Sequence, residues 1–312
     1  MIKDNVAFLF VGQGSQEIGM GKDFYESIPS CKEIFLKSSE ILNMDMESLM
    51  FNGTDEELKK TENAQPAILL ASLLALEGLK EAGIYGKYTA GLSLGEYGAL
   101  IYGGAISFED GLKLVKERGK IMGSSLPKGL GKMAAILKLN EEKTKELLNR
   151  CSEFGIIQGA NYNCPGQVVV SGENKPVEES IKIAKELGGM GILLNVSGPF
   201  HSSLLEDASF DFMKELEKVD FKDEDKVIYS NVKGLPYEKG DDKRELLKNH
   251  IKSAVLFEKT IKDMLDKGVD TFIEIGPGKT LKGFVKKIDR KAKVFNVYDV
   301  DSLNECINAF KE

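Results

Sequence analysis

Hydrophobic residues form short runs that alternate with helical segments along most of the chain. The helix expected over 67–80 is apolar almost throughout, with Pro66 at its start, so we expect it to lie between a sheet and another helix. Such alternation indicates a mostly parallel sheet with helices on both faces. Buried strands of this sheet are predicted at 6–11, 227–232, 271–275 and 294–298.

The middle of the chain follows a different order. Strands are expected at 133–137, 155–160, 167–171 and 191–196, and helices at 141–150 and 176–187. This βαββαβ order is ferredoxin-like, and glycine-containing segments at 129–131 and 197–199 bracket it as hinges. We therefore predict a ferredoxin-like domain over 129–197, inserted into a larger α/β-hydrolase-like domain formed by 1–128 and 198–312, with a cleft between the two.

Composition limits the class of protein. Hydrophobic residues at 42% and charged residues at 29% are typical of a soluble globular protein. A net charge of −7 argues against nucleic acid as the main partner. The four cysteines follow no metal-ligand spacing, and we find neither a signal peptide nor an apolar stretch of membrane-spanning length. We expect a cytoplasmic monomer with free thiols and no metal, membrane or nucleic-acid site.

One short motif carries most of the chemical information. Gly91-Leu92-Ser93-Leu94-Gly95 matches G-x-S-x-G, the turn that exposes a nucleophilic serine between a strand and a helix. The flanks agree with this context, because 88–90 is extended and apolar and 96–101 can begin a helix. Ser93 is therefore the candidate nucleophile. We interpret Glu96 as a helix cap without a chemical role, since the helix dipole favours an acid there.

A nucleophilic serine needs a base, and the chain has two histidines. His201 follows a glycine–proline hinge, and we expect it to be the base. In an α/β-hydrolase the histidine comes near the C-terminus, after the acid, so the position of His201 agrees poorly with that order. His250 is the competing candidate, but it lies in a lysine-rich amphipathic stretch and is typical of a residue near a helix end.

A second glycine-rich turn, Gly12-Gln13-Gly14, follows the strand expected at 6–11. The oxyanion of acyl transfer is stabilised by one backbone N–H after the nucleophile and one from a neighbouring strand-end loop. We assign these donors to Leu94 and Gln13. The alternative for the second turn is a plain tight turn without a catalytic role.

Taken together, the motifs resemble those of malonyl-CoA:acyl carrier protein transacylases from about residue 5 to about residue 290. The resemblance implies an enzyme of fatty-acid synthesis without a cofactor. It would move a malonyl group from malonyl-CoA to acyl carrier protein by ping-pong transfer through an acyl-enzyme on the serine. The segments that carry it are 10–16, 65–66, 91–96, 118–122, 161–167, 199–201 and 274–278.

The resemblance also implies roles for residues outside the two turns. Arg118 would hold the malonyl carboxylate, because a guanidinium can pair with it bidentately; by itself it would be an exposed arginine of the helix expected at 111–122. Phe200 would narrow the pocket, unless it is only a core residue. Asn161 and Asn163 are weaker candidates for polar contacts to the substrate arm, because asparagine before Pro-Gly is equally typical of a turn.

Three positions depart from the family pattern. Leu92 stands where histidine is frequent before the nucleophile, and Val11 stands where proline usually precedes Gly12. His250 occupies the position of a glutamine whose backbone carbonyl orients the catalytic histidine. A backbone carbonyl survives a change of side chain, so the resemblance still implies that His250 orients His201 through its main chain.

Two alternative functions remain. One is a serine esterase or thioesterase, which would have no use for a buried cation at Arg118. The other is a catalytically idle module that binds carrier protein, which would not need both Ser93 and His201. Because carrier proteins are acidic, docking would need a local basic patch. The candidate patches are Lys116, Arg118, Lys120 and Lys128, or Lys282, Lys286, Lys287 and Arg290.

Overall fold

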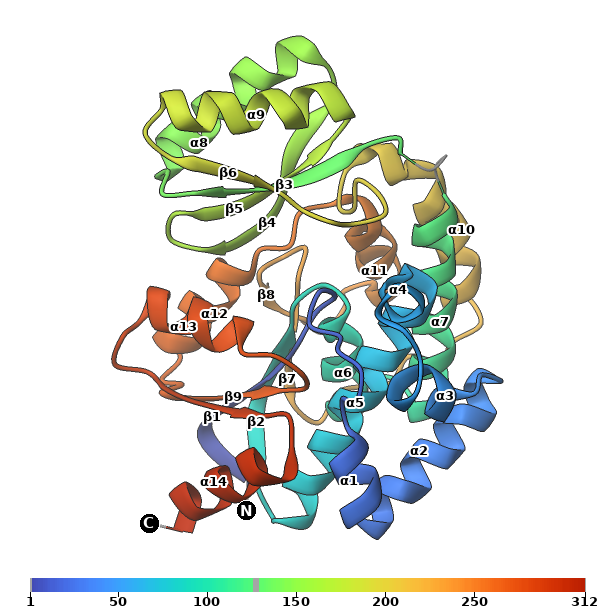
Figure 1. Ribbon diagram of the computed structural model, residues 1–312. Coiled ribbons are helices and arrows are strands. Elements are labelled where there is room, and N and C mark those ends of the chain that lie inside the picture. Colours follow the sequence, from blue (N-terminus) through green and yellow to red (C-terminus); the bar gives the residue numbers. More distant parts are fainter. Residues whose placement is uncertain (1, 126–128, 312) are drawn as a thin grey trace.

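A six-stranded sheet forms the centre of the larger part of the molecule (Figure 1) in the computed structural model, which describes residues 2–125 and 129–311. Its strand order is β10-β9-β1-β2-β7-β8, and only the last pair, β7 and β8, is antiparallel. The expectation of a mostly parallel sheet is confirmed. The strands are β1 (Ile2–Phe10), β2 (Tyr85–Gly91), β7 (Val227–Ser230), β8 (Leu235–Pro236), β9 (Thr271–Ile275) and β10 (Lys293–Val297).

Helices pack against the strands of this sheet. The helix α6 (Gly95–Tyr102) packs on β1, β2 and β7, while α13 (Thr280–Ile288) and α14 (Val300–Lys311) pack on β10. A long helix, α5 (Thr61–Glu81), packs against α7 (Phe108–Ser124), whose first turn is capped by the Ser107 side chain. The other helices of this part are α1 (Lys22–Ser27), α2 (Pro29–Leu42), α3 (Met46–Phe51), α4 (Asp55–Lys59), α10 (Glu206–Leu216), α11 (Lys243–Lys252) and α12 (Phe257–Asp266), with a 3-10 turn at Ser203–Leu205.

The expectation that Pro66 starts the long helix was wrong. The helix begins at Thr61, and Pro66 lies inside it. The first turn is established before the proline, because the Lys60 carbonyl accepts hydrogen bonds from the amides of Asn63 and Ala64. The added turn is polar in sequence, but Gln65 in it is fully buried, so its helical state depends on tertiary contacts that a hydrophobic pattern does not record.

A second sheet of four antiparallel strands lies between β2 and β7 in sequence. Its spatial order is β4-β5-β3-β6, and two helices cover one face of it (Figure 1). The chain order of these elements is strand, helix, strand, strand, helix, strand, as predicted. The elements are β3 (Lys132–Leu137), α8 (Glu141–Cys151), a 3-10 turn (Ser152–Phe154), β4 (Ile157–Cys164), β5 (Gln167–Gly172), α9 (Asn174–Glu186) and β6 (Met190–Leu193).

The two faces of this smaller sheet have different roles. Side chains alternate across a strand, so Ala134 and Ile136 pack in a small core with α8 and α9. Their neighbours Met133 and Ala135 point the other way, toward the main core, and line a large cavity. The smaller sheet thus contributes one wall to a cavity whose floor belongs to the larger sheet.

The two expected hinge segments lie side by side. A Cβ atom on Gly131 would come within 2.4 Å of the Pro199 ring, and Gly131 has a φ of +88°. The first expected boundary, at residue 128, lies outside the described residues.

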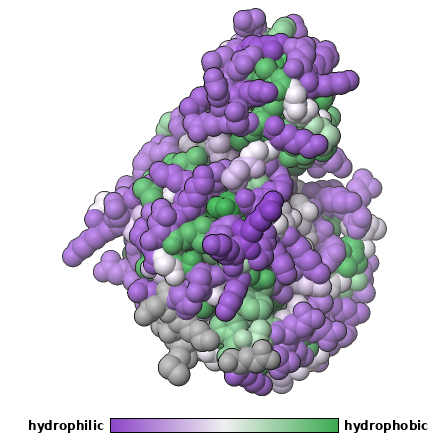
Figure 2. Space-filling model, turned by 90° about the vertical axis from the view of Figure 1, so that its left-hand side faces the viewer, coloured by the Kyte–Doolittle hydropathy of each residue, from purple (hydrophilic) through white to green (hydrophobic). Residues whose placement is uncertain are grey.

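Hydrophilic residues cover most of the face in Figure 2, with hydrophobic residues in smaller areas between them. Within the described residues, no helix has both the length and the apolar character required to cross a membrane.

Candidate active site

A cleft of about 1150 Å³ lies between the two sheets, at the carboxyl ends of β1 and β2. Ligands of open parallel sheets commonly bind at such strand ends. The cleft contains Ser93 and His201 together with Gln13, Asn163 and Phe200. Its other walls include residues 14–16, 59–62, 122–124 and 194–197, and Met133, Ala135, Gln167, Val169, Thr280 and Phe284.

The turn around Ser93 is as tight as the G-x-S-x-G motif predicts. A Cβ atom on Gly91 would lie 1.9 Å from the Gly95 carbonyl carbon, and one on Gly95 would lie 2.1 Å from the Phe10 carbonyl oxygen. Neither position can carry a side chain without moving the backbone. The glycines therefore let β2, the turn and α6 pass directly against β1, which leaves Ser93 at the strand end facing the cleft.

Both Ser93 and His201 adopt left-handed backbone conformations, with φ of +53° and +58°. This region costs a residue with a Cβ atom roughly 1–2 kcal/mol, and strain of this kind clusters at functional sites. Contacts outside the turn must hold Ser93 there. Its amide donates a hydrogen bond of 2.7 Å to Asn231 Oδ1, from the residue that follows β7.

His201 is placed to accept the serine proton. Its Nε2 lies 2.7 Å from Ser93 Oγ, and its Nδ1 lies 2.8 Å from the backbone carbonyl oxygen of His250. A carbonyl oxygen only accepts, so Nδ1 carries the proton and Nε2 presents its lone pair to the serine hydroxyl. Burial, and next the charge of Arg118, lower the pKa of His201 to about 3, which keeps the ring neutral at pH 7.

The loop that carries His201 is fastened to the smaller sheet by Gln158 of β4. Gln158 Nε2 donates to the His201 carbonyl at 3.1 Å, and Gln158 Oε1 accepts from the Ser203 amide at 3.0 Å. The sequence analysis missed Gln158. No sequence motif marks Gln158, because its two partners, His201 and Ser203, lie 43 and 45 positions away in the sequence.

Arg118 is fully buried, so the alternative of an exposed arginine is wrong. Its NH2 donates to Ser93 Oγ at 3.1 Å and its NH1 donates to Gln65 Oε1 at 2.8 Å, while the guanidinium lies over the Tyr97 ring at 5.5 Å. Its Nε finds no hydrogen-bond partner among the described residues, and the nearby Glu96 carboxylate attracts the guanidinium without forming a described ion pair with it. Burial lowers the pKa of Arg118. The site thus holds a buried cation beside the nucleophile.

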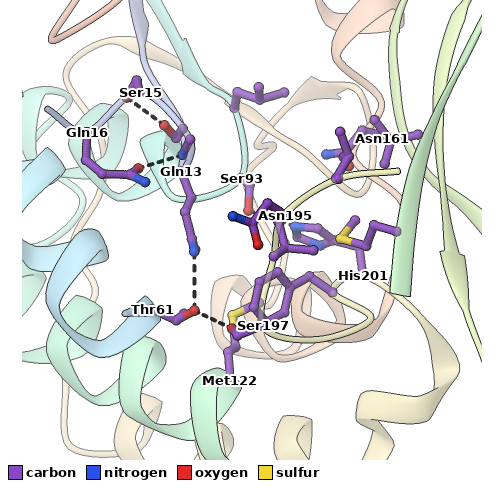
Figure 3. Close-up of a pocket in the computed structure, with 18 of the residues that line it drawn as sticks. Gln13, Ser15, Gln16, Thr61, Ser93, Met122, Asn161, Asn195, Ser197 and His201 are labelled. Carbon is purple, nitrogen blue, oxygen red and sulfur yellow. Dashed lines mark hydrogen bonds between the residues drawn. The ribbon is translucent and has the colours of Figure 1, made fainter. Parts of the chain in front are cut away.

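Gln13 and Leu94 lie beside Ser93. In the view of Figure 3, Gln13 and Thr61 are on one side of Ser93, and Asn161 and His201 are on the other. The Gln13 side chain is already engaged, because it donates to Thr61 Oγ1 and accepts from Gln65, each at 3.3 Å. Neither the Gln13 amide nor the Leu94 amide donates to another described residue. Leu94 directly precedes α6, so its N–H lies at a helix N-terminus.

The remaining predicted substrate residues also line the cleft. Phe200 is 6% exposed and Asn163 is 4% exposed, and Asn163 Oδ1 has no hydrogen-bond partner among the described residues. Asn161 forms a parallel bridge with Val255, which joins β4 to the segment after α11. Asn163 is therefore an unsatisfied polar side chain at the wall of the cleft.

The interpretation of Glu96 as a plain helix cap was wrong. Its side chain is 1% exposed and accepts from the Tyr237 hydroxyl at 2.5 Å and the Asn231 amide at 3.2 Å. His250 Nδ1 lies 3.1 Å from Glu96 Oε2, although neither ring nitrogen of His250 makes a well-formed hydrogen bond with a described residue. Burial raises the pKa of Glu96 to about 7. The helix dipole therefore does not account for the presence of an acid at position 96, because its carboxylate is buried among Tyr237, Asn231 and His250.

His250 reaches the site through its main chain. Its ring is fully buried, far from the exposed position that a lysine-rich stretch suggests, and stacks on the His201 ring with 5.1 Å between centroids. Burial and the neighbouring His201 lower the pKa of His250 well below its usual value. Ser93 Oγ contacts His201 Nε2 at 2.7 Å, whereas neither ring nitrogen of His250 has a hydrogen-bond partner among the described residues.

The candidate docking lysines lie in different surroundings. Lys116 donates to the Leu42 carbonyl, and Lys120 lies 3.7 Å from Glu117. Lys128 is outside the described residues. Lys287 of α13 donates to Gln167 at 3.1 Å, and Gln167 lines the cleft, so this helix lies beside the cleft. No group of three or more described His, Cys, Asp or Glu side chains could hold a metal ion.

Comparison with known proteins covers nearly the whole chain. Residues 7–300 match the family model for the acyl transferase domain. Malonyl CoA-acyl carrier protein transacylase of Bacillus subtilis (strain 168) is 46% identical over 310 residues, which cover 98% of each protein. A crystal structure of malonyl CoA-acyl carrier protein transacylase from Clostridium perfringens ATCC 13124 has a TM-score of 0.96 at 46% identity, covering 98% of this chain and 97% of that one.

A third similar structure includes a carrier protein. It is described as a type II PKS acyl-carrier protein in complex with its malonyl-transacylase, and its matched chain has a TM-score of 0.94 at 32% identity. The match covers 98% of this chain and 100% of that chain.

Proposed function

This chain belongs to the family of malonyl CoA-acyl carrier protein transacylases, and we propose that it transfers malonyl groups through an ester on Ser93. In the first half-reaction, Ser93 Oγ attacks the thioester carbonyl of malonyl-CoA while His201 Nε2 takes the hydroxyl proton. The C–S bond then breaks, and His201 returns the proton to the departing thiolate of coenzyme A. This pairing of nucleophile and neutral base is supported by the 2.7 Å contact between Ser93 and His201.

The second half-reaction reverses these roles. His201 takes the proton of the phosphopantetheine thiol on acyl carrier protein, and the thiolate attacks the malonyl ester. The C–O bond breaks, and Ser93 Oγ regains a proton from His201. The carbonyl of His250 would hold the imidazole in the same tautomer through both halves, which is supported by its 2.8 Å bond to Nδ1.

The observation that carries the assignment to malonyl is the buried guanidinium of Arg118. A cation without a carboxylate partner is costly to bury, and here it lies 3.1 Å from the nucleophile. The free carboxylate of malonyl would supply the missing anion while its thioester carbon lies at Ser93. Because the charge of Arg118 contributes to lowering the pKa of His201, pairing with the substrate would also make His201 a stronger base.

The backbone amides of Leu94 and Gln13 would stabilise the oxyanion. Leu94 follows Ser93 in the chain, Gln13 lines the same cleft, and neither amide donates to another described residue. Amides that are already oriented stabilise developing charge without reorganising during the reaction. The Asn163 side chain would contact the acyl or pantetheine arm, and Phe200 would limit the width of the acyl pocket.

We also propose the finer description of the protein. The strand order β4-β5-β3-β6 supports a ferredoxin-like domain over 129–197, and the serine turn after a parallel strand supports an α/β-hydrolase-like domain formed by 1–128 and 198–312. The buried, unpaired thiols of Cys31, Cys151, Cys164 and Cys306 support a cytoplasmic location. We propose a monomer as well, and the face shown in Figure 2 is largely hydrophilic, as a surface exposed to water would be.

Mass measurement of the intact protein tests the proposal. Incubation with malonyl-CoA should add one malonyl group, and acyl carrier protein carrying phosphopantetheine should remove it and become malonylated. Ser93→Ala should abolish the adduct, whereas Cys164→Ala, a change of a buried thiol in the smaller sheet, should retain it. An adduct that persists in Ser93→Ala would contradict the serine assignment. Rapid release of free malonate without an acceptor would favour a thioesterase.

A further inference from the structure

We propose that Asn231 is a positioning residue for the reaction, and that its carboxamide holds the backbone of the Ser93 turn in its reactive shape. The inference rests on the proposed function, because it concerns the same nucleophile. Asn231 directly follows β7, the strand that pairs with β2 next to the serine turn. It belongs to none of the motifs that point to the site.

The carboxamide of Asn231 binds the turn on both sides of Leu92. Its Oδ1 accepts from the Ser93 amide, and its Nδ2 donates to the Gly91 carbonyl oxygen, each at 2.7 Å. One planar group therefore satisfies the backbone of the residue before Leu92 and of the residue after it. A side chain with a single donor or a single acceptor could bind only one side.

Asn231 is itself held from below. Its amide donates to Glu96 Oε2 at 3.2 Å, and its carbonyl accepts from the Leu256 amide at 2.9 Å. Glu96 is fastened in turn by the Tyr237 hydroxyl at 2.5 Å. Asn231 is only 2% exposed, so solvent does not compete effectively for these bonds. The role of the buried Glu96 in this arrangement is to hold the backbone of Asn231, which is not the role of a helix cap.

The strained conformation of Ser93 explains why the turn needs such support. At a φ of +53°, the serine backbone occupies a region that residues with a Cβ atom avoid. If the two bonds to Asn231 were lost, the peptide units on either side of Leu92 could rotate toward ordinary conformations. Ser93 Oγ would then leave its positions 2.7 Å from His201 Nε2 and 3.1 Å from Arg118 NH2. A displacement of about 1 Å can reduce a reaction rate roughly 100-fold.

Two substitutions separate this role from general stability. Asn231→Leu has a similar shape but can make neither bond. Asn231→Asp keeps the acceptor for the Ser93 amide and can donate to the Gly91 carbonyl only when the acid is protonated. The matched control is Asn296→Leu, because Asn296 is also a buried asparagine of the parallel sheet, and its Nδ2 donates to the Gly278 carbonyl at 2.9 Å. Its bond does not involve the serine turn.

The measurements are the rate of malonyl-enzyme formation, the rate at which a sulfonyl fluoride modifies Ser93, and the thermal midpoint. We expect Asn231→Leu to lower both rates about 100-fold, with KM for malonyl-CoA changed less than threefold. Asn296→Leu should keep both rates within threefold of wild type, even if its thermal midpoint falls as much as that of Asn231→Leu. Asn231→Asp should recover activity relative to wild type as pH is lowered from 8 to 6.

The outcomes are distinguishable. If wild type forms no adduct on Ser93, the proposed function fails. If wild type forms the adduct and folded Asn231→Leu keeps both rates within threefold, the inference about Asn231 is overturned. Should Asn231→Leu not fold, Asn231→Asp decides, because a loss that does not change between pH 6 and 8 would also overturn it.

Discussion

The imidazole of His201 is oriented by a backbone atom, because its Nδ1 donates a 2.8 Å hydrogen bond to the carbonyl oxygen of His250. No described carboxylate occupies the place of the acid of a serine–histidine–aspartate triad at this nitrogen. The orientation of His201 therefore does not depend on which side chain stands at position 250. The His250 ring fills space beneath His201 instead, with their rings stacked.

Substitutions at the two histidines should consequently differ. His201→Ala should slow formation of the malonyl-enzyme by roughly 10² to 10⁴, the usual contribution of a general base.

His250→Gln keeps the carbonyl and most of the buried volume, so we expect activity within about threefold of wild type. His250→Ala should also keep the base oriented but lose stability through a cavity, by about 2–4 kcal/mol. Stopped-flow acylation and urea unfolding measure these effects, and an inactive but folded His250→Gln would show that the ring itself is required.

Loss of Arg118 should act on malonyl and spare acetyl. Arg118→Ala leaves the bound carboxylate unpaired, a penalty of about 3–5 kcal/mol, so kcat/KM for malonyl-CoA should fall by at least two to three orders of magnitude. Acetyl transfer should hold steady or improve, because acetyl has no carboxylate. Arg118→Lys should be intermediate at best, since an ammonium cannot make two parallel bonds.

The control for Arg118 is Arg150→Ala. Arg150 of α8 pairs with Glu186 of α9 on the exposed side of the smaller sheet, and its removal should leave the rates for both substrates unaffected. An equal loss for malonyl and acetyl in Arg118→Ala would show that Arg118 supports the fold and not the substrate.

Glu96 should make stability depend on pH. Burial raises the pKa of Glu96 to about 7 from 4.5, so the folded state binds this proton more tightly than the unfolded chain. The resulting stability is complete below pH 4.5 and is lost as pH rises through 7. Glu96→Gln removes the titration, and its unfolding free energy relative to wild type should improve by up to about 3 kcal/mol between pH 4.5 and 8.

The pKa values of His201 and His250 are lowered, so these groups contribute the opposite trend. Both remain in the Glu96→Gln variant, and their contribution cancels in the difference. Urea unfolding of the two proteins at pH 5, 6, 7 and 8 provides the comparison. A difference that does not vary with pH would mean that Glu96 titrates near its ordinary value in the fold.

Two glycine substitutions should have opposite effects. A Cβ atom on Gly95 would lie 2.1 Å from a backbone oxygen of β1, so Gly95→Ala should destabilise the protein by about 3 kcal/mol, the upper end of the usual cost of overpacking. Gly283 lies within α13, and a Cβ there would meet nothing within 4 Å, so Gly283→Ala should stabilise by about 0.5–1 kcal/mol. Thermal unfolding compares them. A Gly95→Ala variant as stable as wild type would mean that the serine turn is looser than its geometry indicates.

Local patterns were sufficient for the serine turn and for most elements. The motif 91–95 predicted a strand, a turn and a helix, because its glycines act on their immediate neighbours. Strand β9 begins and ends where the hydrophobic run does, at 271 and 275. The two histidines limited the candidates for the base, but the choice of His201 over His250 rested mostly on the family resemblance, and His201 is the one that contacts Ser93.

Tertiary structure decided which polar residues are buried together. Arg118 and Glu96 have the sequence surroundings of exposed helical residues, and only the packing of α5, α7 and the segment after β7 encloses them. Asn231 meets Ser93 across 138 positions and Gln158 meets His201 across 43. A periodic pattern records which face of an element is apolar, but it does not record which distant carbonyl or carboxylate will meet a given side chain. Asn231 reaches Ser93 because β7 pairs with β2 in the larger sheet, and Gln158 reaches His201 because the smaller sheet packs beside it.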